Sequence, residues 1–432
     1  MNPSDLLSCN EFRVWQDGTE RSAAGLRDDA IRIEAALGAG IPIRAALASS
    51  RADHVVASLT ACQARGCELL LLRDSMPVEP TTLAQWGVSA LIDESLRLTW
   101  MDAPPVEVEG FRVLMTTSGT TGAPKVAKHR VERLTGRIRP AKAGSATARW
   151  LLTYHPASFA GLQVVLTAIG VGGDLICMAR PTIASLAEAA LATRPTHISG
   201  TPTFWRGFLL ALGERAAEIP LVQATLGGEA VDQSILNRLR ARFPYAGLTH
   251  IYASTEAGAL FAVRDGQAGF PASWLEHEVD GIELRVRHGQ LEVRSPRAMD
   301  GYVAASVDTP LTQDGWLRTG DSVEIGGNRV IFLGRADSTI NVGGAKVLPE
   351  EVEAVLLELP AVADVRVYAV KNPITGELVA AEVVLQQGSE PASARAAILA
   401  HARSRLAEYK VPRILRYTGQ IAASEAGKKN RV

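Results

Sequence analysis

Short apolar runs alternate with amphipathic helical patterns near the start of the chain, and this alternation restricts the possible folds more than any other feature. Helical spacing occurs at residues 23–37 and 54–65, and apolar runs occupy residues 40–43, 68–72 and 90–92. Apolar runs of this length, separated by helical segments, are typical of parallel strands joined by crossover helices. The pattern therefore predicts an α/β domain made of parallel-type βα layers.

The same alternation continues after residue 110, in segments at residues 113–115, 150–153, 162–169, 174–178, 183–192, 197–200 and 223–226. Near residue 280 the pattern changes. The runs at residues 283–286, 289–293 and 329–333 predict strands joined by tight turns. We therefore expect a small antiparallel β unit after the parallel layers.

A third pattern follows Asp337. It predicts helices at residues 349–359 and 393–407, and strands at residues 365–370 and 378–385. The sequence thus predicts two domains. Residues 1–336 form a large N-terminal domain, and residues 337–432 form a small, mobile α+β domain at the C-terminus.

Charge and cysteine content exclude several classes of protein. The 432 residues include 45 Lys and Arg against 46 Asp and Glu, a net charge of −1. A dedicated nucleic-acid-binding protein usually has a strongly basic balance, so we expect no nucleic-acid partner. Four cysteines are too few for a disulfide framework, and none lies in a CxxC pair that would indicate structural zinc.

One long stretch without charged residues deserves comparison with a membrane span. Residues 150–173 contain no Lys, Arg, Asp or Glu, but they include His155, Pro156 and four glycines. A strand, a buried helix and a turn fit this composition better than a transmembrane helix does. The first residues carry Asp5 and Glu11 and lack the apolar core of a signal peptide. We expect a cytoplasmic protein without a membrane span.

The most informative motif is MTTSGTTGAPKV at residues 115–126, directly after a predicted strand. Glycines let a backbone approach an anion closely, and backbone N–H groups and hydroxyls can bind it. Lys125 adds a point charge suited to a polyphosphate. The spacing differs from that of a Walker A loop. The predicted phosphate-binding residues are Thr117, Ser118, Gly119, Thr120, Thr121 and Gly122, with Lys125 as a catalytic residue.

This loop resembles the phosphate loop of the adenylate-forming enzymes, which include acyl- and aryl-CoA ligases, nonribosomal peptide adenylation domains and luciferases. Other segments resemble that family's landmarks in the same order: YASTEAG at 252–258, GWLRTGD at 315–321, GRAD at 334–337, INVGGAKV at 340–347, PEEVE at 349–353 and GK at 427–428. The landmarks cover residues 115 to 431. The chain is therefore identified as a member of this superfamily, similar to stand-alone acyl- and aryl-CoA ligases.

The resemblance implies how ATP and magnesium are bound. Tyr252 would stack on adenine, with Thr255 beside it, and Glu256 would be the Mg²⁺ carboxylate and a catalytic residue. A carboxylate oxygen is a hard ligand of the kind that Mg²⁺ takes together with phosphate oxygens. The remaining ATP-binding candidates are Gly228, Glu229, Asp321 and Arg335. Asp321 can accept two hydrogen bonds from a ribose diol.

The resemblance also implies two half-reactions, the first giving an acyl-adenylate and the second a thioester. Lys428 would stabilise the charge that develops during adenylation. The small domain would then rotate about a hinge at Asp337. Gly343 and Gly344 would line the channel for the thiol, because glycines let the backbone pass close to a pantetheine arm.

The acid is less well defined by the sequence. The candidate acyl-binding residues are His155, Ser158, Phe159, Gly161, Gly227 and Ala253. Amino-acid-activating members of the family place an Asp early in the first of these segments, and residues 150–173 contain no carboxylate. The gating residue stays open among His155, Ser158 and Phe159. Apolar surroundings favour an aryl acid first and a medium aliphatic acid second.

Two acceptors fit the resemblance: CoA, or the phosphopantetheine of an acyl carrier protein. Residues 395–432 carry nine Lys or Arg against two Glu. These basic residues, Lys429 and Arg431 among them, could contact the phosphates of CoA or an acidic carrier-protein helix. The phosphate loop also begins closer to the start of the chain than is usual in the family, which slightly favours the carrier protein. A catalytically inactive nucleotide-binding homologue is the alternative from another class.

Overall fold

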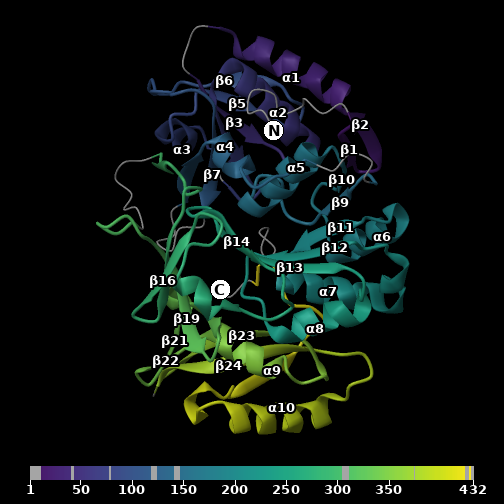
Figure 1. Ribbon diagram of the computed structural model, residues 1–432, viewed down its shortest axis with the longest axis vertical. Coiled ribbons are helices and arrows are strands. Elements are labelled where there is room, and N and C mark those ends of the chain that lie inside the picture. Colours follow the sequence, from purple (N-terminus) through teal and green to yellow (C-terminus); the bar gives the residue numbers. More distant parts are fainter. Residues whose placement is uncertain are drawn as a thin grey trace.

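The computed structural model describes residues 11–39, 43–76, 79–117, 124–140, 146–303, 311–373, 375–423 and 428–429. A large α/β domain carries two mixed sheets and an antiparallel β unit. A smaller α+β domain, which we call the lid, packs against one end of it, drawn in green and yellow at the bottom of Figure 1. This architecture confirms the predicted fold class.

The first sheet has seven strands in the order β18-β8-β7-β4-β3-β5-β6, of which β7, β4, β3 and β5 are parallel. Its strands are β3 (Arg44–Ala48), β4 (Glu68–Leu72), β5 (Ala90–Ile92), β6 (Leu98–Trp100), β7 (Arg112–Thr117), β8 (Lys125–His129) and β18 (Gly301–Tyr302). The associated helices are α1 (Ala23–Leu37), α2 (Ala52–Arg65), α3 (Pro80–Gln85) and α4 (Val131–Thr135).

The second sheet has eight strands in the order β14-β13-β12-β11-β9-β10-β1-β2, and all but the two edge strands run parallel. They are β1 (Arg13–Gln16), β2 (Thr19–Ser22), β9 (Arg149–Leu152), β10 (Asp174–Cys177), β11 (His197–Gly200), β12 (Gln223–Gly227), β13 (Gly247–Ser254) and β14 (Gly258–Val263). The helices are α5 (Phe159–Val171), α6 (Ile183–Thr193), α7 (Pro202–Leu212), η1 (Gly213–Glu218) and α8 (Gln233–Arg242). Trp205 and Phe208 of α7 are fully buried in its core.

The antiparallel unit has the strand order β15-β20-β19-β17-β16. Its elements are β15 (Phe270–Pro271), η2 (Ala272–Leu275), β16 (Glu283–Arg287), β17 (Gln290–Arg294), β19 (Leu317–Gly326) and β20 (Arg329–Arg335). A buried cluster that includes Phe261 and Phe270 joins it to the second sheet. This packing places β19 and β20 beside the end of β13.

The lid follows β20 through the short helix η3 (Ala336–Ser338). Its elements are β21 (Ile340–Val342), β22 (Ala345–Val347), α9 (Pro349–Leu356), β23 (Val362–Asn372), β24 (Gly376–Leu385), α10 (Pro391–Arg405), η4 (Glu408–Lys410) and β25 (Ile414–Tyr417). The helices bury Val352, Leu356 and Ile398 against the lid sheet. Figure 1 shows β23 and α9 facing α7 and α8 of the large domain.

Most predicted elements occur close to their predicted residues, and the uncharged stretch at 150–173 forms β9, α5 and a turn as expected. No helix in the described ranges is long and apolar enough to cross a membrane. The strand predicted at residues 40–43 is displaced. Ile43 precedes the strand, β3 begins at Arg44, and residues 40–42 lie outside the described part of the chain. Arg44 can enter a buried strand because its Nε donates to Glu68 Oε2 of β4 at 2.6 Å.

Candidate functional site

Tyr252 and Asp321 form the centre of the predicted adenosine region. The Tyr252 ring lies 5.2 Å from the Phe261 ring and 4.8 Å from the Phe332 ring, between centroids. Its hydroxyl donates a hydrogen bond to Asp321 Oδ2. Burial and the Asp321 carboxylate raise the pKa of Tyr252 well above its usual value. The hydroxyl therefore stays protonated and holds the carboxylate in one orientation.

Asp321 is linked through Arg335 to the predicted hinge. Arg335 Nη1 lies 3.8 Å from Asp321 Oδ1, and Arg335 donates to both oxygens of Asp337 at 3.1 and 3.0 Å. Burial raises the pKa of Asp321, while Tyr252, Arg335 and Lys428 oppose that rise. The hydrogen bond from Arg335 lowers the pKa of Asp337. One guanidinium thus contacts both the predicted ribose-binding carboxylate and the hinge residue.

Glu256 lies in a group of oxygen donors beside the phosphate loop. The Tyr302 hydroxyl donates to Glu256 Oε1 at 3.1 Å, and the Thr117 hydroxyl interacts with Tyr302. Lys125 Nζ lies 5.4 Å from the centre of the Tyr302 ring. Sequence reasoning missed Tyr302, and only the pairing of β18 with β8 reveals it, because residue 302 is far from the loop in sequence.

This donor set fits Mg²⁺, which commonly takes one or two carboxylates and completes its shell with substrate phosphates and water. Glu256 supplies a carboxylate and Thr117 a hydroxyl, and both interact with the hydroxyl of Tyr302. No cluster of three or more His, Cys, Asp or Glu suited to a metal occurs in the part of the chain that the structure describes. A metal bound at Glu256 would therefore depend on the phosphates of the nucleotide.

The phosphate loop connects two antiparallel strands. Thr117 at the end of β7 pairs with Lys125 at the start of β8. The predicted residues Ser118, Gly119, Thr120, Thr121 and Gly122 lie outside the described residues, as does Gly427. Thr117 and Lys125 therefore lie at the same end of the β7–β8 pair. Tyr302 lies on β18, the strand that pairs with β8 on its other side.

Lys428 reaches the site from the lid. A Cβ placed on Gly228 would lie 3.7 Å from Lys428 Cε, and Gly228 has a positive φ of 84°. The charge of Lys428 also acts on the Asp321 carboxylate. Lys428 therefore approaches the residue that follows β12 and acts on Asp321 of β19, although 200 residues separate it from Gly228. A side chain at position 228 would be strained and would crowd this lysine.

Glu229 binds the backbone of both domains. Its Oε2 accepts a hydrogen bond from the Thr203 N–H at 3.0 Å, and its Oε1 accepts one from the Lys429 N–H at 2.8 Å. Thr203 lies in the first turn of α7, where backbone N–H groups lack helical partners. Glu229 thus connects α7 to the lid. The contact of Glu229 with ATP stays a prediction.

The acyl-binding candidates form a tight turn before α5. Ser158 caps the helix by accepting from the Gly161 N–H at 3.0 Å, and its hydroxyl donates to the His155 carbonyl at 2.7 Å. A Cβ on Gly161 would lie 2.1 Å from that same carbonyl oxygen, so this position requires glycine. The Phe159 ring lies 5.8 Å from the ring of His129. Ser158 and Gly161 therefore stabilise the structure of this turn.

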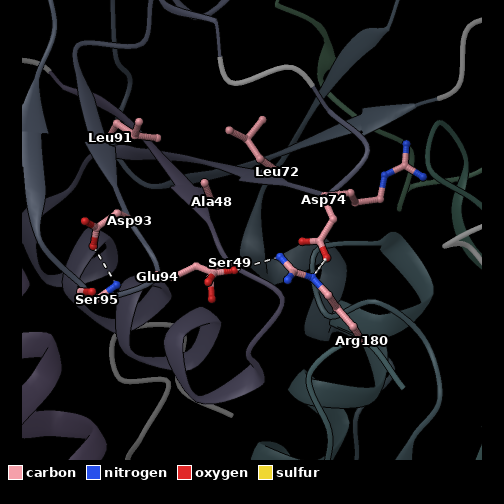
Figure 2. A pocket seen from close by; sticks show the side chains of 10 residues that line it. Ala48, Ser49, Leu72, Asp74, Leu91, Asp93, Glu94, Ser95 and Arg180 are labelled. Atoms are coloured by element: carbon pink, nitrogen blue, oxygen red, sulfur yellow. Dashed lines mark hydrogen bonds and ion pairs between the residues drawn. The ribbon is translucent and has the colours of Figure 1, made fainter. Parts of the chain in front are cut away.

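A cavity of about 430 Å³ lies at the carboxyl ends of β3, β4 and β5 (Figure 2), and its lining residue Asp74 contacts His155. His155 Nε2 lies 3.5 Å from Asp74 Oδ1, and Arg180 Nε donates to Asp74 Oδ2 at 2.7 Å. Arg180 also contacts Glu94 at 3.3 Å. Burial tends to raise the pKa of Asp74, but Arg180 and His155 lower it overall. The cavity is lined by charged as well as apolar side chains, so it differs from the apolar acyl pocket expected near His155.

The remaining candidates lie at strand ends and in a turn. Gly227 ends β12, and Ala253 follows a register shift in β13. Gly343 and Gly344 form the turn between β21 and β22, with φ angles of 60° and 90°. The Gly344 N–H donates to Asn341 Oδ1 at 3.0 Å, and Gly344 borders a lid cavity of about 840 Å³. Glycine is favoured at both turn positions because L-residues adopt such φ values at a cost.

His129 is a second residue that sequence reasoning missed. It ends β8, is fully buried and contacts the backbone of Thr255, which follows the predicted adenine tyrosine. Burial lowers the pKa of His129 to about 4. A single buried histidine carries no signal in one sequence, so only the tertiary structure places it behind the site.

Comparison with known families matches two consecutive parts of the chain. Residues 36–303 match the AMP-binding enzyme family, and residues 351–428 match the AMP-binding enzyme C-terminal domain. Similar curated proteins include 4-coumarate--CoA ligase-like 4 of Oryza sativa, 28% identical over 73% of this chain and 61% of its own. A probable 2-succinylbenzoate--CoA ligase of Mycobacterium tuberculosis is 29% identical over 74% and 82%. The chain thus spans about 61% of the length of some of these relatives.

Solved structures with the same fold include the anthranilate CoA ligase AuaEII in complex with anthranoyl-AMP. That structure has a TM-score of 0.80 at 20% identity, with 99% of this chain and 95% of the other covered. The amide bond synthetase McbA from Marinactinospora thermotolerans has a TM-score of 0.74 at 22% identity, with 98% and 96% covered. These likenesses confirm the fold that the motifs predicted.

Proposed function

Because the chain belongs to the AMP-binding enzyme family, we propose that it is an ATP-dependent acid–thiol ligase acting in the cytoplasm. It would adenylate an aryl or medium aliphatic carboxylic acid and transfer the acyl group to CoA. The observation that carries this proposal is that Lys428 of the lid approaches Gly228 of the large domain, from where its positive charge acts on the predicted ribose-binding carboxylate Asp321. An inactive homologue would have no need to keep that arrangement.

In the first half-reaction, a carboxylate oxygen of the acid attacks the α-phosphorus of ATP. A new P–O bond forms, and the bond from the α-phosphorus to the bridging oxygen breaks, so that pyrophosphate leaves. Lys428 would offset the negative charge that grows between the two reacting groups. Tyr252 and Arg335 hold Asp321 for the ribose, so the nucleotide is oriented before the reaction.

Magnesium would be held by Glu256 and the phosphates, with Thr117 close by. When bound, it supplies positive charge to the phosphate oxygens. Lys125 would bring a further positive charge to the pyrophosphate. Tyr302 keeps Glu256 in place, because its hydroxyl donates to one carboxylate oxygen.

In the second half-reaction, the thiol sulfur attacks the acyl carbon. The bond from that carbon to the AMP oxygen breaks, and the thiol proton is released. Lys428 must withdraw to admit the thiol, which requires rotation of the lid about Asp337. The Arg335–Asp337 ion pair spans this hinge, and the Gly343–Gly344 turn would form the wall of the thiol channel.

The names of several relatives support an aryl acid. They include feruloyl-CoA synthase, 4-chlorobenzoate--CoA ligase and 2-succinylbenzoate--CoA ligase, at 27–28% identity. The uncharged residues 150–173 give no partner for an α-ammonium group, which argues against an amino acid. Long-chain-fatty-acid--CoA ligase of Bacillus subtilis is also similar, at 26% identity, so aliphatic acids belong in the test.

The test is carboxylate-dependent ATP–pyrophosphate exchange with a panel of aryl, hydroxyaryl, short and medium aliphatic acids, and amino acids as controls. We expect exchange with aryl acids. The active acid is then offered with CoA or with a phosphopantetheinylated carrier protein, and thioester formation identifies the acceptor. A folded protein that binds ATP but exchanges with no acid would contradict the proposal and favour the inactive homologue.

A further inference from the structure

Lys429, which follows the predicted catalytic lysine, is buried in an ionic cage. Only 4% of its side chain is exposed. Its Nζ lies 3.0 Å from Asp364 Oδ1 and 3.3 Å from Glu353 Oε2, and it donates to the Val365 carbonyl. Burial lowers the pKa of Lys429, but the two carboxylates outweigh burial and raise it overall. The ammonium therefore remains charged inside the protein.

The cage belongs to the lid itself. Glu353 lies in α9, and Asp364 and Val365 lie in β23. The Lys429 backbone also forms an antiparallel bridge with Ala423, downstream of β25. These contacts fix Lys429 to the lid core. Since Lys428 is the adjacent residue, the anchor at Lys429 determines where the Lys428 side chain begins.

The same anchor contacts the large domain. The Lys429 N–H donates to Glu229 at 2.8 Å, and Arg206 of α7 lies 3.8 Å from the Asp364 oxygen that Lys429 binds. Arg238 of α8 donates to the carbonyls of Val362 and Ala363 at 2.5 and 2.7 Å. Asp364 is thus shared between the lid lysine and a large-domain arginine. The Asp364 carboxylate therefore takes part both in docking of the lid and in placement of Lys428.

We propose that Lys429 is a positioning residue for adenylation, whose caged ammonium and Glu229-bound N–H together hold Lys428 against Gly228. The inference rests on the proposed function and adds a determinant of its first half-reaction. Removing the ammonium would take away the nearest cation of two buried carboxylates, Glu353 and Asp364, and breaking a buried ion cluster in this way is strongly destabilising. The terminal segment would then detach, and displacement of a reacting group by about 1 Å can cost about 10²-fold in rate.

The test compares Lys429→Met with Lys429→Arg and with Lys410→Met. Methionine keeps the aliphatic length and removes the charge, whereas arginine keeps the charge. Lys410 is a matched control, because it also pairs with a lid carboxylate, Glu351, at 2.5 and 2.7 Å. Each variant is measured for pyrophosphate exchange and, separately, for transfer of a pre-formed acyl-adenylate to the thiol.

We expect Lys429→Met to lower exchange at least 10-fold, about 1.4 kcal/mol, and to lower transfer less than threefold. Lys429→Arg should recover most of the exchange. Lys410→Met should leave pyrophosphate exchange, which needs no thiol acceptor, at the wild-type level. A merely structural role would lower both half-reactions alike. Equal losses in the two half-reactions, or unchanged exchange in Lys429→Met, would overturn the inference.

A second readout does not depend on activity. Amide hydrogen exchange of the peptide covering residues 418–432 should become at least 10-fold faster in Lys429→Met and stay unchanged in Lys410→Met. Unchanged protection in Lys429→Met would overturn the inference even if no acid were active. Silence of the wild type in pyrophosphate exchange, with faster hydrogen exchange in the variant, would contradict the proposed function alone and leave the anchor supported.

Discussion

The adenosine side of the site and its lid side are built from different interactions. On the adenosine side, Tyr252 is fixed by aromatic rings and by a hydrogen bond to Asp321, all within the large domain. On the lid side, Lys428 and Lys429 meet Gly228 and Glu229 across two domains, mainly through polar contacts. Buried aromatic packing is lost only at high cost, whereas a polar contact can be exchanged for water. The proposed reaction needs a fixed nucleotide and a movable lysine.

The largest predicted effect tests the movable side. Lys428→Ala should lower pyrophosphate exchange by about 10²–10³-fold, because a donor aimed at developing charge is lost. Transfer from a pre-formed adenylate should change only a few-fold. Normal pyrophosphate exchange in Lys428→Ala would show that Lys428 takes no part in the proposed adenylation. The contrast between a fixed adenosine side and a movable lid side would then lose its support.

The second prediction concerns the hinge that would separate the two sides. Asp337→Pro removes the carboxylate that Arg335 binds and restricts the backbone of η3. Thioester formation should fall by on the order of 10²-fold, since the lid no longer reaches its second position accurately. Exchange should fall much less. An equal loss in both half-reactions would contradict a hinge at this residue.

The third prediction tests the fixed side. Tyr252→Phe keeps the aromatic ring and removes the hydroxyl that donates to Asp321. Loss of a hydrogen bond to a charged group costs roughly 1.5–3 kcal/mol, so the KM for ATP should rise about 10- to 100-fold. Tyr154→Phe, at a buried tyrosine two residues after the end of β9, is the control. An unchanged KM in Tyr252→Phe would mean that Asp321 does not depend on this donor.

The smallest predicted effect concerns stability behind the fixed side. The pKa of His129 is about 4 in the folded protein and about 6.5 when exposed, so the unfolded chain binds the proton first as the pH falls. The contribution of neutral His129 to the free energy of unfolding is therefore complete above pH 6.5 and is lost progressively as the pH falls toward 4. Between pH 7 and pH 5 the free energy of unfolding should fall by about 2 kcal/mol on account of this residue.

Urea unfolding at the two pH values measures this effect. His129→Gln should remove that part of the pH dependence, whereas His277→Gln, at an exposed position, should retain it. The same pH dependence in His129→Gln as in the wild type would show that His129 is not the group responsible.

Local patterns were sufficient for most elements and for the order of the motifs. The helix at Ala23–Leu37 and the strands at Glu68–Leu72 and Ala90–Ile92 occur at the predicted residues because apolar spacing reports burial directly. The predicted position of the strand at residues 40–43 was wrong. An arginine such as Arg44 is expected at the surface unless its buried partner, here Glu68, is known. Tyr302 was missed because only the pairing of β18 with β8 brings it to the site, and His129 because a single histidine gives no sign of burial in one sequence.

The sequence by itself determined the α/β class and the family, because hydrophobic periodicity and motif spacing are properties of neighbouring residues. The domain boundary and the site residues stay predictions. Only the tertiary structure decided which groups share a contact. Glu229 binds an N–H 200 positions away, and Lys429, expected among residues facing an anionic partner, is buried among lid carboxylates. The physical reason is that the desolvation of a charge and its compensation depend on partners in space, which one chain read in order does not specify.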